Sequence, residues 1–336
     1  MRGRALLDNL QSGVVVLAAL FLGGGQTATA KATITVFDVP NAASTFAYAI
    51  AADGSVTGWW QDASYAYHGF LRAPDGTVTT FDPRGSHGTQ PVGINGKDVI
   101  TGSYDDRHSN PHGFVRKAGG KITRFYAPGA TQTGPAAIND AGTVTGYWVD
   151  ASGRYHGFVR AADGTITSFD PKGSTGTAAS AINAGGEIAG SYADSSGVTH
   201  GFLRSADGKI THFDVSGTTY TSPNAINKAG VIAGYYLNGG TLGGFVRAAD
   251  GTITTFDPKG SAETLPYGIN DRGEITGSWT DGTEARGFRR SANGTIKSFD
   301  PPQSIETIPV GINKSGAITG FFADTSGNDH GFVRTP

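Results

Sequence analysis

The sequence predicts an all-β protein made of repeated four-stranded units, and two observations lead to this prediction. Glycine is abundant at 52 residues, and apolar stripes at helical spacing are missing after residue 30. A phrase of the type HGFVR recurs at spacings of 43 or 44 residues, which is typical of repeat architectures whose units pack against their neighbours. The copies start at His68, His112, His156, His200, Gly243, Arg286 and His330.

Each unit contains four short segments of β-type composition that are separated by turn residues. In the sixth unit these segments are TLPYGIN, EITGSWTD, ARGFRRS and TIKSFDP, between residues 264 and 301. Asp-Gly pairs, as at Asp163 and Gly164, are strong signals for tight hairpins, and Asn-x-x-Gly, as at Asn139 to Gly142, suits an Asx-stabilised turn. We therefore expect each unit to be a four-stranded antiparallel meander.

The length of the units and the two ends of the chain decide how the meanders are arranged. Units of about 40 to 45 residues with four strands favour a closed propeller over an open β-solenoid, whose coils are shorter. A strand-like segment, TITVFDVP at Thr33 to Pro40, precedes the first unit, and the last unit stops after its third segment. We predict a seven-bladed β-propeller with four antiparallel strands per blade, in which the N-terminal strand completes the last blade.

The first 30 residues have the layout of a secretory signal peptide. Two arginines lie within the first four residues, an apolar run extends from Val14 to Leu22, and Ala28 to Ala30 supply a cleavage site. Such a short run cannot span the roughly 30 Å hydrocarbon layer of a membrane. We expect residues 1–30 to be removed and residues 31–336 to form a single domain, periplasmic or extracellular, with no membrane span in the mature chain.

Charge and cysteine content narrow the partners and the chemistry. The formal net charge is −2, without the basic surplus that accompanies nucleic-acid binding. The chain has no cysteine, which excludes disulfides, a lipid-attached cysteine and thiolate catalysis. We expect a monomer held together by packing and hydrogen bonds, with no nucleic-acid partner.

The repeat resembles the bacterial extracellular HAF-repeat family. The resemblance is carried by AINDAGTVTGYW and YHGFVR, and the pattern covers nearly all of residues 33 to 334. Glycine stands in place of the family's alanine, and arginine stands in place of its tryptophan, in every copy. The resemblance implies export and a repeat fold, and it implies no activity and no site residues.

Three sets of residues recur in the units, and a structural role explains each set best. An arginine closes every copy of the phrase, from Arg72 onward, and we expect its stem to pack and its guanidinium to bind turn carbonyls or an acid. Five histidines follow an aspartate by six residues, as His156 follows Asp150, which favours a hairpin hydrogen bond over metal ligation. A threonine before each first strand, from Thr45 onward, either caps a turn or forms a polar rim at the channel mouth.

A single ligand site on a symmetric ring has to be a departure from the repeat, because perfect repetition would produce identical sites. The second unit has the richest titratable cluster, in the loop RGSHG and the long hairpin DDRHSNPH. Where other units read FDP or FDV, the segment assigned to the third blade reads FYAP. No catalytic residue or metal ligand is assigned, since no triad or metal-binding spacing accompanies the cluster. The predicted ligand-binding residues are Arg84, His87, Asp105, Arg107, His108 and Tyr126.

The residue after the glycine of each second segment alternates between bulky and small. An odd number of units cannot close such an alternation, so two bulky residues meet where the ring closes, and we expect that junction to pack differently. The series is Trp59, Ser103, Tyr147, Ser191, Tyr235, Ser278 and Phe321.

Three classes of function fit these patterns. We predict first an exported binding module for glycans or cell-surface polymers, because aromatic rings stack on sugar faces while Asp, Asn and Thr pair with hydroxyls. A protein–protein interaction scaffold is the second class, and a propeller-type lyase or hydrolase with its site on the loop face is the third. No motif indicates a cofactor, and calcium is left open as a ligand although no motif points to it.

Overall fold

Every regular element of the described residues is a β-strand. The computed structural model describes residues 32–336, and the predicted signal peptide, residues 1–30, lies outside them. The all-β prediction is confirmed for this part of the chain. Between residues 32 and 336 no helix is long and apolar enough to cross a membrane.

The strands follow the repeats of the sequence, which we number 1 to 7 in chain order. Before repeat 1 comes β1 (Thr33–Phe37). Repeats 1 to 3 contain β2 (Ser44–Ile50), β3 (Val56–Gln61), β4 (Tyr67–Arg72), β5 (Val78–Phe81), β6 (Gly88–Ile94), β7 (Ile100–Asp105), β8 (Pro111–Arg116), β9 (Ile122–Phe125), β10 (Gln132–Ile138), β11 (Val144–Val149), β12 (Tyr155–Arg160) and β13 (Ile166–Phe169). Repeats 4 and 5 contain β14 (Gly176–Ile182), β15 (Ile188–Ala193), β16 (Thr199–Arg204), β17 (Ile210–Phe213), β18 (Thr221–Ile226), β19 (Ile232–Asn238), β20 (Thr241–Arg247) and β21 (Ile253–Phe256). Repeats 6 and 7 contain β22 (Glu263–Ile269), β23 (Ile275–Thr280), β24 (Ala285–Arg290), β25 (Ile296–Phe299), β26 (Ser304–Ile312), β27 (Ile318–Asp324) and β28 (Asp329–Thr335).

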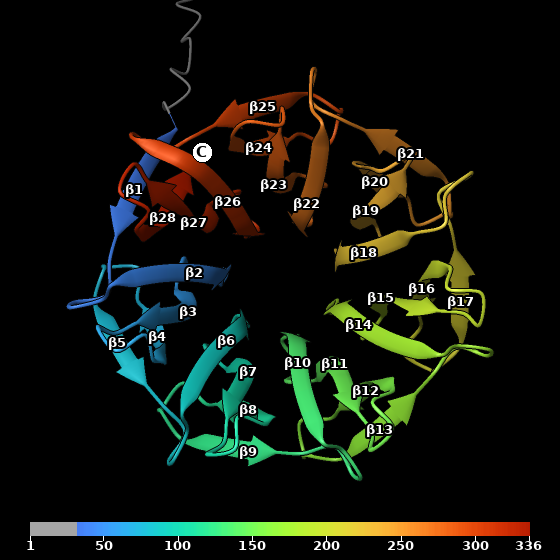
Figure 1. The fold of residues 1–336 in the computed structure, drawn as a ribbon, viewed down its shortest axis with the longest axis horizontal. Helices are drawn as coiled ribbons and strands as arrows, with labels where there is room; N and C mark the ends of the chain where they lie inside the picture. Colours follow the sequence, from blue (N-terminus) through green and yellow to red (C-terminus); the bar gives the residue numbers. More distant parts are fainter. Residues whose placement is uncertain (1–31) are drawn as a thin grey trace, which may run out of the picture. The chain divides into compact units, whose positions relative to one another are not determined.

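Within each repeat the strands pair antiparallel in chain order, as predicted. Repeats 1 to 5 are four-stranded sheets, and repeats 6 and 7 share one eight-stranded sheet that includes β1. The two halves of this sheet are joined by a single parallel pair, Ala285 with Glu306. Figure 1 shows the sheets standing around a central opening, with the first strand of each repeat innermost. This arrangement is that of a β-propeller.

The N-terminal strand closes the ring, as predicted. β1 pairs antiparallel with β28, from Thr33 opposite Thr335 to Phe37 opposite Gly331. Repeat 7 therefore receives its fourth strand from the other end of the described chain. The pairing covers the outer edge of β28, which would otherwise offer free backbone groups to another chain.

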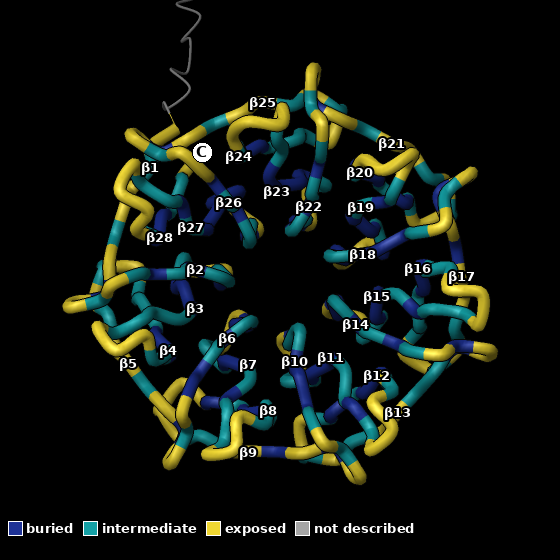
Figure 2. The backbone as a smooth tube through the Cα atoms, viewed as in Figure 1, coloured by how far each residue is buried: buried dark blue, intermediate teal, exposed yellow. Residues whose placement is uncertain are grey.

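The core lies between neighbouring sheets and uses the same residues in each repeat. The phenylalanine of every HGFVR phrase is fully buried, and it meets edge-on a phenylalanine from the outer strand of the preceding repeat. Phe202 and Phe169 form one such pair, with ring centroids 5.8 Å apart. In Figure 2 buried segments lie within the sheets, and exposed segments lie at the loops and the outer rim.

The recurring arginines complete this packing. Arg204 lies over the ring of Phe169 at 5.0 Å from its centroid, and the other six arginines of the phrase make the equivalent contact. Its Nη1 also donates to the carbonyl of Ser205 at 3.3 Å. Each contact joins two repeats through a cation–π interaction, which confirms the structural role predicted for these arginines.

The predicted His–Asp pairs are present, and four of the histidines bridge two acids. His156 Nε2 lies 3.3 Å from Asp150 across the hairpin, and its Nδ1 lies 2.7 Å from Asp170 of the FDP phrase. The second acid was not predicted. In repeat 7 the second acid is Asp38, which follows β1, and His330 Nδ1 lies 3.0 Å from its Oδ1. This contact links the two ends of the described chain.

The recurring threonines are fully buried and serve turns. Thr45 Oγ1 accepts the N–H of Val39 at 3.1 Å, and Thr133 Oγ1 accepts that of Ala127 at the same distance. Both threonines are 0 % exposed. Of the two roles considered, the turn-capping one is therefore confirmed, and these hydroxyls form no polar rim.

Candidate functional site

A cavity of about 640 Å³ occupies the central channel, and its lining differs from one repeat to another. One residue from every repeat lines it, at the same position of the innermost strand. The backbone at that position is identical in all repeats, but the side chain varies. These channel residues are Tyr48, Val92, Ala136, Ser180, Asn224, Tyr267 and Val310.

A β-bulge directs these side chains into the channel. In repeat 1 the register between β2 and β3 shifts between Ala47 and Ala49, which leaves Tyr48 without an opposite residue. The same shift occurs in the innermost strand of every other repeat. A bulge adds one unpaired residue and re-aims its side chain, and here it does so toward the axis.

The channel has an aromatic wall and a wall of small residues. Repeats 1, 5 and 6 contribute Tyr48, Tyr235 and Tyr267, whereas repeats 3 and 4 contribute mainly alanines and Ser180. Burial raises the pKa of the Tyr48 and Tyr267 phenols, and the neighbouring Tyr48 and Tyr235 hydroxyls raise that of Tyr267 further. These phenols are therefore neutral at physiological pH and can both donate and accept hydrogen bonds.

A fourth tyrosine, Tyr147, belongs to repeat 3 and lines the channel with the small residues. Tyr147 of β11 lines the channel and lies against Gly134, where an added Cβ would collide with its ring. Burial raises the pKa of Tyr147 as well. Glycine at position 134 therefore leaves the space that the Tyr147 ring occupies.

Asn224 supplies an amide to the channel. Its Nδ2 donates to the carbonyl of Pro266 at 2.8 Å, so Oδ1 is the atom left to accept a hydrogen bond. The residues that line the channel include no Asp, Glu, Lys, Arg or His. The cavity can therefore stack flat apolar faces on its rings and pair hydroxyls with phenols, an amide and a serine.

An apolar collar separates the channel from a smaller cavity of about 240 Å³ at one mouth. Isoleucines from the ends of the innermost strands line both spaces. They are Ile50, Ile182, Ile226 and Ile269.

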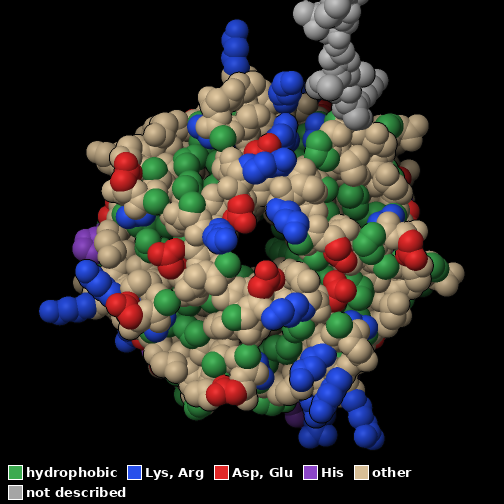
Figure 3. All heavy atoms as spheres, turned by 180° about the vertical axis from the view of Figure 1, so that it is seen from behind, with side chains coloured by type: hydrophobic (Ala, Val, Ile, Leu, Met, Phe, Trp, Pro, Cys, Tyr) green, Lys and Arg blue, Asp and Glu red, His purple; other side chains and the backbone are tan. Residues whose placement is uncertain are grey.

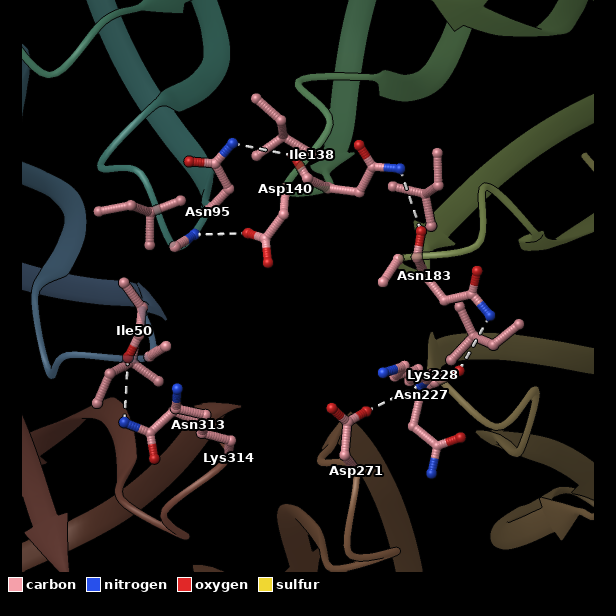
Figure 4. A pocket seen from close by; sticks show the side chains of 18 of the residues that line it. Ile50, Asn95, Ile138, Asp140, Asn183, Asn227, Lys228, Asp271, Asn313 and Lys314 are labelled. Carbon is pink, nitrogen blue, oxygen red and sulfur yellow. Dashed lines mark hydrogen bonds between the residues drawn. The ribbon is translucent and has the colours of Figure 1, made fainter.

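Asparagines at the turns beyond the collar connect the repeats (Figure 4). Asn139 Nδ2 donates to the carbonyl of Asn183 in the next repeat at 3.1 Å, and Asn183 donates to Asn227 at 3.1 Å. Asn139 Oδ1 accepts two N–H groups of its own turn. All of these bonds lie within the protein, which indicates a structural role.

Charged residues of both signs line the mouth outside this ring. Asp140 accepts the N–H of Gly96 at 2.8 Å, and Asp271 accepts that of Lys228 at 2.9 Å. Lys228 and Lys314 line the same mouth. Figure 3 shows the opening from behind, surrounded by basic and acidic side chains. The mouth is therefore hydrophilic, whereas the channel beyond the collar is neutral.

The structure divides the predicted ligand-binding cluster into separate places. The N–H of His87 donates to the carbonyl of Asp105 at 2.8 Å, and His87 lines a surface cavity of about 250 Å³ with His68 and Asp82. Burial and the neighbouring Asp106 raise the pKa of Asp105.

The other predicted residues lie outside that cavity. Arg84, Arg107 and His108 are exposed, and the closest acid to His108 is Asp106 at 4.0 Å. Tyr126 follows β9, so it belongs to repeat 2; its assignment to the third blade was wrong because the fourth strand comes after the HGFVR phrase.

Tyr126 pairs with residues of its own repeat. Its hydroxyl lies 2.6 Å from that of Tyr104, and its ring lies 4.4 Å from that of His112. None of the six predicted residues lines the channel. A ligand-binding role for this cluster stays a prediction.

The channel residues were missed, although the sequence contains a signal for them. The end of each first segment reads AYAI, PVGI, PAAI, ASAI, PNAI, PYGI or PVGI, in which one variable position stands between Ala or Pro before it and Ala or Gly after it. Variation at one place in an otherwise constant repeat marks a position that packing does not dictate.

Comparison with known proteins supports the fold and leaves the family open. No family model matches the chain, and no curated protein matches it. Among solved structures, virginiamycin B lyase from Staphylococcus aureus has a TM-score of 0.61 at 14% identity, covering 91% of this chain and 100% of that chain. The β-propeller domain of the Trilobed protease from Pyrococcus furiosus has a TM-score of 0.61 at 8% identity, covering 87% and 94%.

A third solved structure matches over only part of its length. A puromycin-hydrolyzing peptidase of Mycobacterium tuberculosis has a TM-score of 0.60 at 12% identity, covering 87% of this chain and 54% of that chain. At these identities the likeness shows the fold alone. Residues 32–336 of the chain thus form a β-propeller that resembles lyase and peptidase propellers in architecture.

Proposed function

We propose that the chain is an exported seven-bladed β-propeller binding module that takes a neutral, polyhydroxylated ligand of the glycan class into its central channel. The observation that carries the proposal is the uncharged channel, in which tyrosines of repeats 1, 5 and 6 line one part, and the alanines and Ser180 of repeats 3 and 4 line the other together with Tyr147. A ring-shaped ligand can stack on the aromatic wall while its hydroxyls meet Asn224 and Ser180.

The seven-bladed reading is supported by the sheet pattern. Five sheets have four strands, and the eight-stranded sheet divides into two sets of four at the Ala285–Glu306 pair. One residue pair is a weak link compared with the ladders inside each set. Export and membership of the HAF-repeat family rest on the sequence patterns, and both are part of this proposal.

A neutral ligand is favoured by the composition of the channel. A charged group placed among phenols, alanines and one amide would lose its water without gaining a partner of opposite charge. Sugar rings have apolar faces and hydroxyl rims, and phenols and amides satisfy both.

Binding is favoured over catalysis by the chemistry of the same walls. A lyase or hydrolase needs a base or nucleophile that is active near neutral pH. The titratable groups of the channel are tyrosines, and burial raises the pKa of Tyr48, Tyr147 and Tyr267 above the ordinary phenol value. Phenols with raised pKa values stay protonated near neutral pH, so they are not available as bases and keep a proton to donate in a hydrogen bond.

The experiment that tests the proposal is a glycan array, followed by titration calorimetry on the glycans that bind. We expect selective binding by the wild-type protein and a loss of affinity of about tenfold or more in Tyr267→Ala, since a stacked aromatic contributes on the order of 1 kcal/mol beyond its buried area. Tyr65→Ala is the matched control, because Tyr65 is 75% exposed and lies outside the channel.

A blank array, or equal losses in both variants, would refute the channel assignment and favour a protein partner. Binding should survive a calcium chelator. Among the described residues no group of three or more His, Asp or Glu side chains gathers as metal ligands. Loss of binding on chelation would point instead to the aspartates at the loop face.

A further inference from the structure

We propose that a groove over repeat 4 continues the channel and holds further units of the same ligand, so that the preferred ligand is a chain of neutral sugar rings. This inference rests on the proposed function and makes its ligand class more specific. The groove encloses about 250 Å³. Ala178 lines both the groove and the channel, which places the two cavities next to each other.

The floor of the groove is formed by the smallest pair of facing residues in the ring. Ala178 of β14 lies opposite Ser191 of β15. The other six repeats place at least one larger side chain in this pair, so repeat 4 has the smallest pair at this position among the described strands. The other pairs are Phe46–Trp59, Gln90–Ser103, Gly134–Tyr147, Ser222–Tyr235, Leu265–Ser278 and Ile308–Phe321.

Tyrosines from the two neighbouring repeats form the walls. Tyr155 of repeat 3 and Tyr220, which precedes β18 of repeat 5, line the groove on either side of repeat 4. Tyr155 packs on Tyr147 with ring centroids 5.2 Å apart, and Tyr220 stacks on Tyr235 at 5.8 Å. Because Tyr147 and Tyr235 line the channel, aromatic surface is continuous from the channel to the groove on both sides.

Hydrogen bonds hold one wall in place before any ligand arrives. The Tyr220 hydroxyl lies 3.4 Å from that of Tyr235, and the Tyr220 carbonyl accepts the N–H of Leu237 at 3.1 Å. The adjacent Thr219 carbonyl accepts the N–H of Thr199 at 2.9 Å. A wall that is already ordered does not have to lose conformational freedom when a ligand binds.

The chemistry of the groove matches that of the channel. Its lining has no charged side chain, and Ser191, Thr199 and the tyrosine hydroxyls supply donors and acceptors beside the rings. Tyr155 is 45% exposed, so its ring face is accessible from solvent. A linear oligosaccharide presents the same alternation of apolar faces and hydroxyls along its length, and one such chain can occupy both cavities.

The test compares short and long probes of the same sugar. We would titrate the protein with cello-, chito- and manno-oligosaccharides of two and of six units. For the series that binds, the hexamer should bind at least about tenfold more tightly than the dimer, because only the hexamer reaches the groove. Ala193→Leu fills the groove with the residue that repeat 5 has at the same position, Leu237, and Ala193 does not line the channel. In this variant the dimer should bind as in the wild type, and the ratio between the two lengths should fall to about one.

Two controls keep the result decisive. Tyr65→Ala should leave the ratio unchanged, since Tyr65 lines neither cavity. If the filled variant fails to fold, Tyr155→Ala takes its place, because this change removes one wall without adding bulk. The affinity for the hexamer should then fall by about threefold or more, and the affinity for the dimer should not change.

The outcomes separate the two proposals. Dimers that bind without any gain for hexamers, or a gain that persists in the filled variant, would overturn the groove while leaving the channel site intact. A lack of binding by every series at both lengths would overturn both proposals.

Discussion

The asparagine ring at the channel mouth lacks one member, and restoring it should stabilise the protein. Six asparagines donate from Nδ2 to the carbonyl at the same position of the next repeat, at distances between 2.9 and 3.1 Å. Repeat 1 has Ala51 at this position. Ala51 accepts the bond from Asn313 at 3.0 Å, but it has no side-chain donor for Asn95. Ala51→Asn should complete the ring.

The expected gain follows from the turn that is already present. Ala51 donates its N–H to the carbonyl of Ser55 at 2.8 Å, as Asn139 does to Thr143 at 3.0 Å, so the backbone is preformed. One additional intramolecular hydrogen bond adds about 0.5–1.5 kcal/mol to the free energy of unfolding. The new Oδ1 adds less, because the turn's own aspartate already accepts the N–H of Ser55. We expect a net stabilisation of about 1 kcal/mol.

Urea unfolding followed by tryptophan fluorescence measures the effect. The midpoint of Ala51→Asn should rise, whereas Ala51→Asp, which has the same shape but no donor, should not share the gain. Asn139→Ala removes one bond to the next repeat and two within its turn, and it should cost about 2–4 kcal/mol. An equal gain in the aspartate variant, or a lower midpoint for Ala51→Asn, would refute the reasoning.

Three further variants test the packing, the closure and the channel. Arg160→Met removes the charge above a phenylalanine of the preceding repeat. The free energy of unfolding in urea should fall by ~0.5–2 kcal/mol, the range of cation–π contacts, and an unchanged midpoint would contradict this. Burial alone would lower the pKa of His330, but its bonds to Asp38 and to a second aspartate raise it above 6.5. The contribution of these bonds to the free energy of unfolding is therefore complete below pH 6.5 and is lost as pH rises through the folded-state pKa. The difference in urea midpoint between wild type and His330→Gln should shrink from about pH 6 to about pH 9. A difference that grows over this range would contradict the sign of the argument. Gly134→Ala pushes a methyl group against the Tyr147 ring, so titration calorimetry should show several-fold weaker glycan binding, and full affinity would separate this ring from the site.

The repeat was the feature that sequence predicted best, because its physical cause is local. The HGFVR phrase and the Asp-Gly turns define strands and hairpins within one unit, and they predicted the antiparallel meander that the structure has. The pairing of β1 with β28 was also predictable, since each end of the chain showed a segment that the other end lacked.

Features that depend on contacts between distant segments were harder to predict. The six-residue spacing identified Asp150 as a partner of His156, but the second partner, Asp170, comes from the end of the next strand and depends on the register between β12 and β13. The channel residues were missed for a related reason. A bulge changes the direction of one side chain without changing the apolar pattern around it, so periodicity does not show that Tyr48 or Tyr267 faces the axis.

The odd number of repeats places an aromatic cluster beside one of the channel tyrosines. Bulky and small residues alternate from Trp59 to Phe321, so two bulky residues meet where repeats 7 and 1 adjoin. There Phe46 packs between them, 5.2 Å from Phe321 and 5.7 Å from Trp59, and Tyr48 packs on Trp59 at 4.7 Å. This aromatic cluster supports Tyr48 at the channel wall. Repeat 4 lies across the ring from this junction (Figure 1), and there the small pair of Ala178 and Ser191 opens the groove. A symmetric scaffold can thus acquire a single oriented site. The two bulky residues that meet between repeats 7 and 1 distinguish one side of the ring, and the small pair of repeat 4 distinguishes the side across from it.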